Sequence, residues 1–357
     1  MDHSVIYKRE GHYAGFPVLA PLADGRLSVG IPVSPFHDHY AIGDWVVLVS
    51  TDEGGNWSQT DDPTVPHTWP GTTPRERYDR LATILPNGNY LCAGTVGWEV
   101  WPSDRQSEAE ALGYAVRPHP AEDSSIIVGG HRLFVQHSTD GGVSWSRHEW
   151  DVPGVQNLTA FPRHAILQDG TLLLTVYGIT PEANRVNYIL RSTDDGETWR
   201  FLSMHAPESA DGSESALIEV TPGQVLAHTR NEQGTLLERW SDDGGQTWSH
   251  PLLTSILGFP PHLLRLADGR LLCSYGYRRD PMGIRAVLSE DDGRTWGNPV
   301  VLRDDGGTPC ALRPDSSGTS DVGYPISTQL SNGDILSVYY ITLEDGLTHS
   351  AATRWQA

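Results

Sequence analysis

The sequence predicts an all-β fold, a six-bladed β-propeller in which residues 1–357 form a single domain. Three observations predict it: a composition suited to short strands, an acidic turn that occurs five times, and a hairpin motif that occurs six times. The chain has 37 glycines, and 12 tryptophans against 6 phenylalanines, with few long apolar runs. This composition is typical of many short strands joined by tight turns.

The acidic turn contains a Ser, an Asp two residues later, a Gly two further on and a final Trp. Its copies are "STDEGGNW" from Ser50, "STDGGVSW" from Ser138, "STDDGETW" from Ser192, "SDDGGQTW" from Ser241 and "SEDDGRTW" from Ser289. The Asp can accept backbone N–H bonds, the Gly can adopt a positive φ, and the Trp can pack under the next blade. Successive copies start 88, 54, 49 and 48 residues apart, and the last three spacings are close to the length of a propeller blade, about 40–50 residues.

The hairpin motif is an aromatic residue, often followed by Pro, then a strand, a turn such as Asp-Gly or Asn-Gly, and a second strand. Its copies start at Phe16, Tyr78, Phe161, Glu214, Phe259 and Tyr324, those at Tyr78 and Glu214 being looser. A blade is therefore predicted to contain this hairpin, a third strand, the acidic turn and a fourth strand, except that the last blade lacks the acidic turn because the sequence ends after its third strand. The N-terminal "SVIYKRE" is expected to supply the outer strand of the sixth blade and to close the ring.

A long insertion interrupts the second blade at about residues 97–130, and its segment "SDRQSEAEALGYA" is predicted to form a short helix. Two further long connections, residues 58–76 and 300–322, join other blades. Long loops on a rigid scaffold often frame a binding site.

The formal net charge of −20 argues against nucleic acid and anionic membrane surfaces as partners, because both favour basic patches. The three cysteines, Cys92, Cys273 and Cys310, are widely spaced and form no CxxC motif, so no disulfide framework, metal site or cofactor is predicted. The start "MDHSVIYKRE" lacks the apolar core of a signal peptide. We therefore expect a cytoplasmic protein, the alternative being secretion if a leader has been removed.

Five acidic turns on six blades resemble the Asp-box, or BNR, repeats of the sialidase superfamily, and the resemblance covers essentially the whole chain. It implies a tyrosine nucleophile activated by a glutamate, an aspartate acting as acid and base, and arginines that bind a substrate carboxylate. "SESALIEVTPGQVLAHTRN" resembles the family's glutamate strand and places Glu214 as the base and Arg230 as a binding arginine. "VGYPISTQLSNGDILSVYY" resembles the nucleophile strand and places Tyr324.

The repeat register supports this pair independently of the resemblance. Glu214 and Tyr324 each lie eight residues before the position of the turn Asp or Asn in their hairpins, which is Pro222 in one and Asn332 in the other. They are therefore expected at equivalent places on different blades, both facing the central axis.

Two further segments complete the site that the resemblance implies. "YGYRRDPMGIRAVLSEDDGRTW" resembles the strand with another binding arginine and places Arg279, or its neighbour Arg278. "SPFHDHYAIGDWVVLVSTDEGG" offers Asp38 as the acid/base, with Asp44 as the less favoured choice because it begins a strand.

The sequence departs from the family pattern at two positions. Gly15 stands where the family has its first arginine, and Tyr340 stands where a glutamate usually braces that arginine. The loss of both together is consistent, because either charge alone would be buried without compensation. We interpret this as a rebuilt pocket, which argues against sialic acid itself but still suits an acidic sugar such as a uronic acid or another ulosonic acid.

The predicted function is therefore an exo-acting glycoside hydrolase acting on a terminal acidic sugar. A tyrosine nucleophile avoids repulsion between two carboxylates at the anomeric carbon, but its pKa near 10 means that a base must take its proton. An aspartate then protonates the leaving group and activates water. The plainer interpretation is that Tyr324 is an aromatic residue closing an inner strand and that the arginines are exposed surface residues.

The histidines leave a second class of function open. His37, His39, His164 and His262 lie near the predicted axis, and Arg77 within "ERYDR" would add positive charge at the second blade. These residues would suit a polysaccharide lyase, or a glycosidase that uses His and Arg beside a uronic acid. The third alternative is a non-catalytic propeller that binds glycans. The sequence leaves the oligomeric state open.

Overall fold

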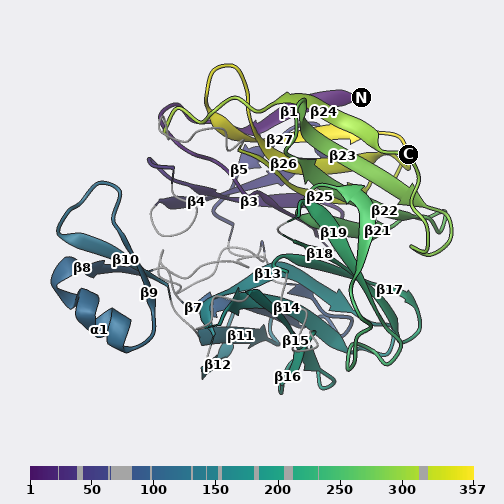
Figure 1. The fold of residues 1–357 in the computed structure, drawn as a ribbon. Coiled ribbons are helices and arrows are strands. Elements are labelled where there is room, and N and C mark those ends of the chain that lie inside the picture. Colours follow the sequence, from purple (N-terminus) through teal and green to yellow (C-terminus); the bar gives the residue numbers. More distant parts are fainter. Residues whose placement is uncertain are drawn as a thin grey trace.

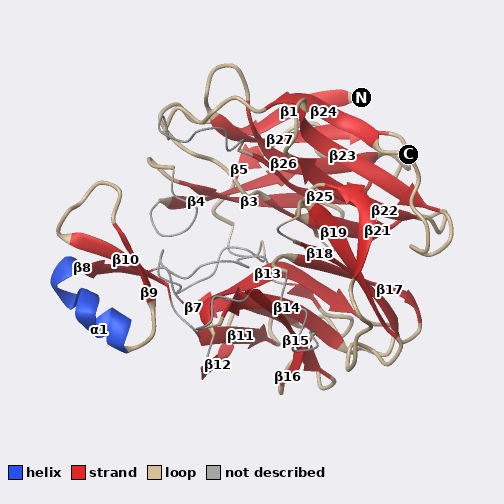
Figure 2. Cartoon of the chain, viewed as in Figure 1, coloured by secondary structure: helices blue, strands red, loops and turns tan. Residues whose placement is uncertain are grey.

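The computed structural model describes residues 1–22, 24–37, 43–62, 65, 83–96, 99–129, 132–141, 143–151, 155–180, 185–204, 212–231, 233–312 and 321–357. Over these ranges the fold is all-β, with one short α-helix (Figure 2). Six four-stranded antiparallel sheets make up most of it, and a seventh sheet has three strands. Within the described ranges no helix is both long enough and apolar enough to span a membrane.

The six four-stranded sheets follow one another along the chain, and we number them in that order (Figure 1). Sheet 1 contains β2 (Val18–Pro21), β3 (Leu27–Val33), β4 (Asp44–Ser50) and β5 (Ser58–Gln59). Sheet 2 contains β6 (Thr83–Ile84), β7 (Tyr90–Val96), β11 (Arg132–Ser138) and β12 (Ser146–Asp151). Sheet 3 contains β13 (Gln156–Ile166), β14 (Leu172–Ile179), β15 (Arg185–Ser192) and β16 (Arg200–Ser203).

The remaining three sheets lie in the C-terminal half, and the last also takes a strand from the N-terminus. Sheet 4 contains β17 (Ser215–Thr221), β18 (Gln224–Arg230), β19 (Thr235–Ser241) and β20 (Leu252–Leu257). Sheet 5 contains β21 (Pro261–Arg265), β22 (Leu271–Tyr277), β23 (Met282–Ser289) and β24 (Val300–Gly306). Sheet 6 contains β25 (Val322–Gln329), β26 (Ile335–Thr342), β27 (Thr348–Trp355) and β1 (Asp2–Tyr7).

The N-terminal strand pairs as the sequence predicted. β1 runs antiparallel to β27, with Asp2 opposite Arg354 and Val5 opposite Ala351, and it forms the outer edge of sheet 6. The two ends of the chain therefore share one sheet, and Figure 1 shows them close together.

Among the described residues, apolar clusters join five pairs of sheets. Between sheets 1 and 6, Val29 and Ile31 of β3 pack with Leu336 and Val338 of β26. Equivalent clusters join sheets 2 and 3, 3 and 4, 4 and 5, and 5 and 6. The first strands also touch in order, since β17 contacts β13 and β21, and β25 contacts β21 and β2. Residues on these first strands, and residues just before them, therefore lie close together although they belong to different sheets.

The acidic turns join the third and fourth strands of sheets 1 to 5, as expected. In the first, Ser50 Oγ donates to Asp52 Oδ1 at 2.8 Å, and Asp52 accepts the Asn56 N–H at 2.8 Å. Hydrogen bonds from Asn56 and Ser50 lower the pKa of Asp52 to about 2. Gly54 adopts a φ of 85°. These carboxylates therefore organise turns.

The prediction that the tryptophan of the acidic turn packs under the next blade is wrong, because the turn packs against the preceding sheet. A Cβ on Gly245 of sheet 4 would lie 2.9 Å from Leu173 of sheet 3. Trp296 of sheet 5 packs against His228 of sheet 4, with ring centroids 5.1 Å apart. The glycine has no side chain, so the turn can approach the preceding sheet closely, and the tryptophan follows on the same side.

The predicted insertion forms a small module at one side of the molecule (Figure 1). Its elements are β8 (Glu99–Pro102), the 3-10 helix η1 (Ser103–Arg105), α1 (Gln106–Ala111), β9 (Ala115–Pro118) and β10 (Ser125–Gly129). The predicted short helix is present as α1, and Ala109 packs on Ile126 and Val128.

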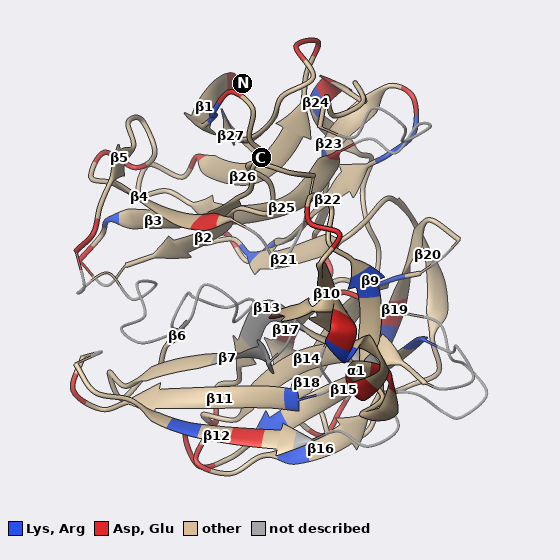
Figure 3. Ribbon diagram, turned by 90° about the vertical axis from the view of Figure 1, so that its left-hand side faces the viewer, with Lys and Arg blue, Asp and Glu red and all other residues tan. Residues whose placement is uncertain are grey.

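Basic and acidic residues are often neighbours on the strands, as on β12 in Figure 3. There, Arg147 Nε donates to Glu149 Oε1 at 2.8 Å. Some of the acidic side chains are therefore paired with basic neighbours.

Candidate active site

Glu214 and Arg230 lie opposite each other at one end of the β17–β18 hairpin. The backbone fixes this pairing, because the Arg230 N–H donates to the Glu214 carbonyl at 2.9 Å and the Ser213 N–H donates to the Arg230 carbonyl at 3.0 Å. Arg230 Nη1 donates to both carboxylate oxygens of Glu214 at 3.2 Å. The Glu214 side chain is 5% exposed and that of Arg230 is 25% exposed. The result is an ion pair with a buried carboxylate and a guanidinium that reaches solvent.

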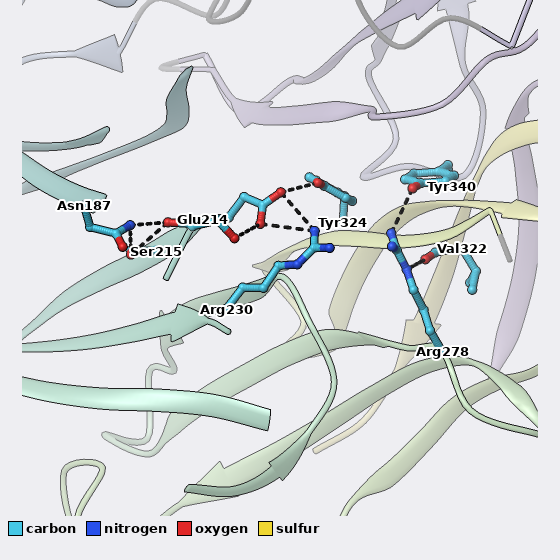
Figure 4. A network of polar contacts seen from close by, with 9 residues as sticks. Asn187, Glu214, Ser215, Arg230, Arg278, Val322, Tyr324 and Tyr340 are labelled. Atoms are coloured by element: carbon cyan, nitrogen blue, oxygen red, sulfur yellow. Dashed lines mark hydrogen bonds and ion pairs between the residues drawn. The ribbon is translucent and has the colours of Figure 1, made fainter. Parts of the chain in front are cut away.

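Tyr324 approaches this ion pair from β25 of sheet 6. Its hydroxyl donates a hydrogen bond to Glu214 Oε1 (Figure 4). Ser213 Oγ donates to the other oxygen, Oε2, at 2.8 Å. Asn187 of sheet 3 holds the Ser213 carbonyl through its side-chain amide. The sequence prediction that Glu214 and Tyr324 meet is confirmed by this geometry, because residues 110 positions apart share one hydrogen bond.

The backbone at Tyr324 is strained in a way that aims its side chain. Tyr324 has a φ of 53°, and the β25–β26 register shifts between Gly323 and Ile326. A left-handed conformation in a bulky residue that precedes a proline costs about 1–3 kcal/mol and occurs mostly at functional sites. Phe16, at the equivalent place in the first hairpin, also has a φ of 53°. Its ring meets that of Tyr324 edge to face, with centroids 4.6 Å apart.

The environment sets the protonation of the pair. Burial alone would raise the pKa of Glu214, but the charge of Arg230 and the hydrogen bonds from Tyr324 and Ser213 outweigh it and lower the pKa. Burial, together with the Glu214 charge, raises the pKa of Tyr324 well above its ordinary value. At neutral pH the resting state is therefore a neutral tyrosine that donates to a carboxylate.

Of the two neighbouring arginines that the sequence offered, Arg278 is the one beside this pair. It follows β22, and its guanidinium carbon lies 6.0 Å from the centroid of the Tyr324 ring. Arg278 and Arg230 lie over the same aromatic ring, that of Phe259, at 5.2 and 4.2 Å from its centroid. Arg279 is exposed and directed toward the turn at Gly234. Two arginines from adjacent sheets thus flank one phenylalanine beside Tyr324.

The two positions that depart from the family pattern lie in an aromatic cluster. A Cβ on Gly15 would lie 2.6 Å from the ring of Tyr13, so the residues present leave no room for an arginine side chain there. Tyr13, Phe16 and Tyr340 are buried together, with Tyr324 packed against them. Tyr340 accepts a hydrogen bond from Arg278 Nη2 at 3.1 Å. Aromatic rings therefore occupy the corner where the pattern would have an arginine and a glutamate.

A buried histidine–aspartate pair lies behind this cluster. His37 Nε2 is 2.8 Å from Asp321 Oδ2, and the two side chains are 8% and 10% exposed. The hydroxyl of Tyr13 donates to the other oxygen, Asp321 Oδ1, at 3.4 Å. The Tyr13 and His37 rings meet edge to face, with centroids 4.8 Å apart. His37 is thus connected to the site through Tyr13.

The other predicted site residues are placed differently or lie outside the described ranges. His262 on β21 accepts the Ser327 N–H at Nδ1, 3.2 Å away, which ties sheet 5 to sheet 6. Asp38, His39 and Arg77 lie outside the described residues, and His164 is described only in its backbone, within β13.

The sequence analysis did not assign Phe259, Tyr13 or Asp321 to the site. Phe259 could have been found from the repeat, because it begins the fifth hairpin motif as Phe16 and Tyr324 begin the first and the sixth. Tyr13 and Asp321 lie outside the repeated motifs, and no sequence signal distinguishes them.

Residues 101–337 match the family described as "BNR repeat-like domain". No curated protein sequence matches the chain. Among solved structures, a protein of unknown function from Dyadobacter fermentans DSM 18053 is 26% identical, with a TM-score of 0.76 over 99% of this chain and 97% of that one.

Two sialidase-type enzymes share the fold at lower identity. The NanB sialidase from Streptococcus pneumoniae is 15% identical, with a TM-score of 0.62 over 99% of this chain and 70% of that one. The intramolecular trans-sialidase from Ruminococcus gnavus is 14% identical, with a TM-score of 0.58 over 96% of this chain and 94% of that one.

Proposed function

The chain belongs to the BNR repeat-like domain family, and we propose that it is a member of the sialidase superfamily and an exo-acting glycoside hydrolase. Its substrate would be a glycan that ends in an acidic sugar, which is sialic acid or a related ulosonic or uronic acid. The observation that carries the proposal is the hydrogen bond from the Tyr324 hydroxyl to Glu214, with Arg230 and Arg278 beside it.

We also infer that the six four-stranded sheets are the blades of a six-bladed β-propeller, with β1 closing the ring. Three observations support this arrangement: the regular strand order within the sheets, the apolar clusters between consecutive sheets, and the contacts between successive first strands. In such a fold the first strands surround the axis. Glu214, Arg230, Arg278 and Tyr324 would then gather at one mouth of the central channel.

In the proposed reaction, the Tyr324 oxygen attacks the anomeric carbon as the bond to the leaving group breaks. The hydroxyl proton passes to Glu214, the carboxylate that already accepts its hydrogen bond. A tyrosine with a raised pKa is a poor nucleophile unless its proton leaves during the attack, and an adjacent base makes this possible. The tyrosine also brings no negative charge toward a sugar that carries its own carboxylate.

The remaining roles complete the chemistry. Asp38 would protonate the oxygen of the leaving group, and would then remove a proton from the water that attacks the anomeric carbon. As the bond between that carbon and the Tyr324 oxygen breaks, Glu214 would return its proton to Tyr324. Arg230 and Arg278 would bind the acidic group of the sugar through charge-assisted hydrogen bonds. Arg230 would also keep Glu214 ionised, because its positive charge lowers the pKa of Glu214.

Turnover by a Tyr324→Phe variant tests the proposal. The wild type is incubated with 4-methylumbelliferyl glycosides of N-acetylneuraminic acid, of glucuronic acid and of neutral sugars. We expect release of fluorophore from an acidic glycoside, and loss of about 10³-fold or more in kcat when the nucleophile is removed. Tyr188→Phe is a matched control, since Tyr188 packs on Phe201 in sheet 3. Unchanged turnover in Tyr324→Phe would contradict the assigned nucleophile.

A lyase or a histidine-based glycosidase is the second candidate, favoured by the buried His37–Asp321 pair. An aspartate that orients a histidine is a common arrangement for a general base. An eliminating enzyme forms an unsaturated sugar that absorbs in the ultraviolet, whereas a hydrolase does not. Activity that survives in Tyr324→Phe but disappears in His37→Ala would favour this candidate. Glycan affinity without product from any substrate would instead indicate a binding protein.

A further inference from the structure

Arg278 is held by neutral groups, in contrast to Arg230. Its Nε donates to the Val322 carbonyl at 2.9 Å, and its Nη2 donates to the Tyr340 hydroxyl at 3.1 Å (Figure 4). Arg230 donates to the carboxylate of Glu214. Among the residues that the structure describes, no carboxylate is within ion-pair distance of Arg278. The charge of Arg278 is therefore not neutralised by a described partner.

Tyr340 is suited to orient a guanidinium without neutralising it. The side chain is 1% exposed on β26, and its ring packs on that of Phe16 with centroids 4.7 Å apart. Burial raises the pKa of Tyr340, against the opposing influence of Arg278, so the hydroxyl stays neutral at physiological pH. A packed ring fixes the oxygen that accepts the Arg278 hydrogen bond.

The carboxylate in this corner is directed away from Arg278. Asp321 directly precedes Val322, the residue whose carbonyl accepts from Arg278. The Asp321 oxygens instead contact His37 Nε2 at 2.8 Å and the Tyr13 hydroxyl at 3.4 Å. Tyr13 lies beside Tyr340, with ring centroids 6.3 Å apart. Asp321 is therefore in contact with Tyr13, and Arg278 with Tyr340, rather than with each other's charged groups.

We propose that Tyr340 is a positioning residue that orients Arg278 beside Tyr324 and leaves its positive charge to the anionic group of the ligand. The inference rests on the proposed function, because it assumes that an acidic sugar binds beside Tyr324 and Glu214. Phe259 underlies both Arg230 and Arg278, so the two guanidinium groups are displayed together. Arg230 then shares its charge between Glu214 and the acid of the ligand, whereas the charge of Arg278 is left to the ligand.

Affinity measurements on Tyr340→Phe test this. The probes are 2,3-dehydro-2-deoxy-N-acetylneuraminic acid, glucuronic acid, and the methyl ester of each, titrated by calorimetry. We expect Tyr340→Phe to weaken binding of an acid by about tenfold, which corresponds to the loss of one hydrogen bond to a charged group, and to leave binding of its ester unchanged. If the wild type turns over a substrate, KM should rise while kcat changes little. Tyr339→Phe is the matched control, because its hydroxyl contacts Thr353 and Arg303 instead.

A double-mutant cycle with Arg278→Gln separates a positioning role from a merely structural one. If Tyr340 acts through Arg278, the double variant should bind the acid no more weakly than Arg278→Gln alone. Fully additive losses, or equal losses for acid and ester, would overturn the inference. Should Tyr340→Phe fail to fold, Arg278→Gln still decides, because undiminished binding of the acid in that variant is incompatible with the inference.

The outcomes for this inference and for the proposed function are distinct. If the wild type binds an acidic probe but hydrolyses no substrate, the proposed hydrolase activity is refuted. The affinities of Tyr340→Phe for the acid and its ester then decide the inference by themselves. If the wild type hydrolyses an acidic glycoside but Tyr340→Phe binds acids as tightly as the wild type does, the inference is refuted and the proposed function stands. A wild type that binds none of the acidic probes overturns the inference.

Discussion

Replacing Glu214 by glutamine should destabilise the protein at neutral pH and change how its stability depends on pH. The substitution keeps the shape of the side chain but removes the charge that faces Arg230. The introduced amide keeps one acceptor oxygen, so part of the hydrogen bonding from Tyr324 and Ser213 can survive. The main loss is the ion pair.

The size of the effect follows from burial. Breaking a buried ion pair by removing one partner costs about 3–5 kcal/mol. Because the Arg230 side chain is 25% exposed and can regain some solvent, we expect about 2–3 kcal/mol. An unfolding entropy of about 2.1 cal/mol/K per residue, over 357 residues, converts this into a fall in Tm of about 3–4 °C.

The pH dependence gives the sharper test. The pKa of Glu214 in the folded protein is below its ordinary value of 4.5. The stabilisation by its charge is therefore fully present above that value, and it is lost as the pH falls through the folded pKa. The difference in Tm between wild type and Glu214→Gln should be largest near pH 7 and should shrink below about pH 4.

Differential scanning calorimetry between pH 3 and pH 7 measures both quantities without a substrate. Glu344→Gln is the control, because Glu344 is exposed, and its curve should follow the wild type. A difference between Glu214→Gln and wild type that stays constant down to pH 3, or grows there, would refute the account of Glu214 as a carboxylate held ionised by Arg230.

Two further predictions address the ring beneath the arginines and the acidic turns. Phe259→Leu keeps an apolar side chain but removes the aromatic face under Arg230 and Arg278; at about 0.5–1 kcal/mol for each of the two cation–π contacts, KM for an acidic substrate should rise about fivefold to thirtyfold, measured by steady-state kinetics. An unchanged KM would mean that the ring does not organise the arginines. Asp194→Asn removes the carboxylate that accepts from Ser192 Oγ at 2.7 Å and from the Thr198 N–H at 3.0 Å; Tm should fall in a thermal scan while kcat/KM is unchanged. A large loss of kcat/KM would contradict a purely structural role for the turn.

The strands and turns of this protein follow from the sequence because their signals are local. In the first acidic turn, Ser50, Asp52 and Gly54 form hydrogen bonds within five residues of one another, so the motif specifies its own shape. The spacing of the hairpins predicted six sheets and placed Glu214 and Tyr324 at equivalent positions. It also indicated that β1 would complete the last sheet. Asp38, His39 and Arg77 stay predictions, since they lie outside the described residues.

The choice of partners at the site was decided by the tertiary structure. Arg278 and Arg279 are adjacent and chemically identical, and only the direction of each side chain places Arg278 beside Tyr324 and Tyr340. The contacts of Tyr13 with Asp321, and of Asp321 with His37, join residues 308 and 284 positions apart. Such contacts carry no periodic signal, because they depend on which sheets become neighbours. The repeats therefore determine where side chains can meet, and the packing of the sheets determines which of them do.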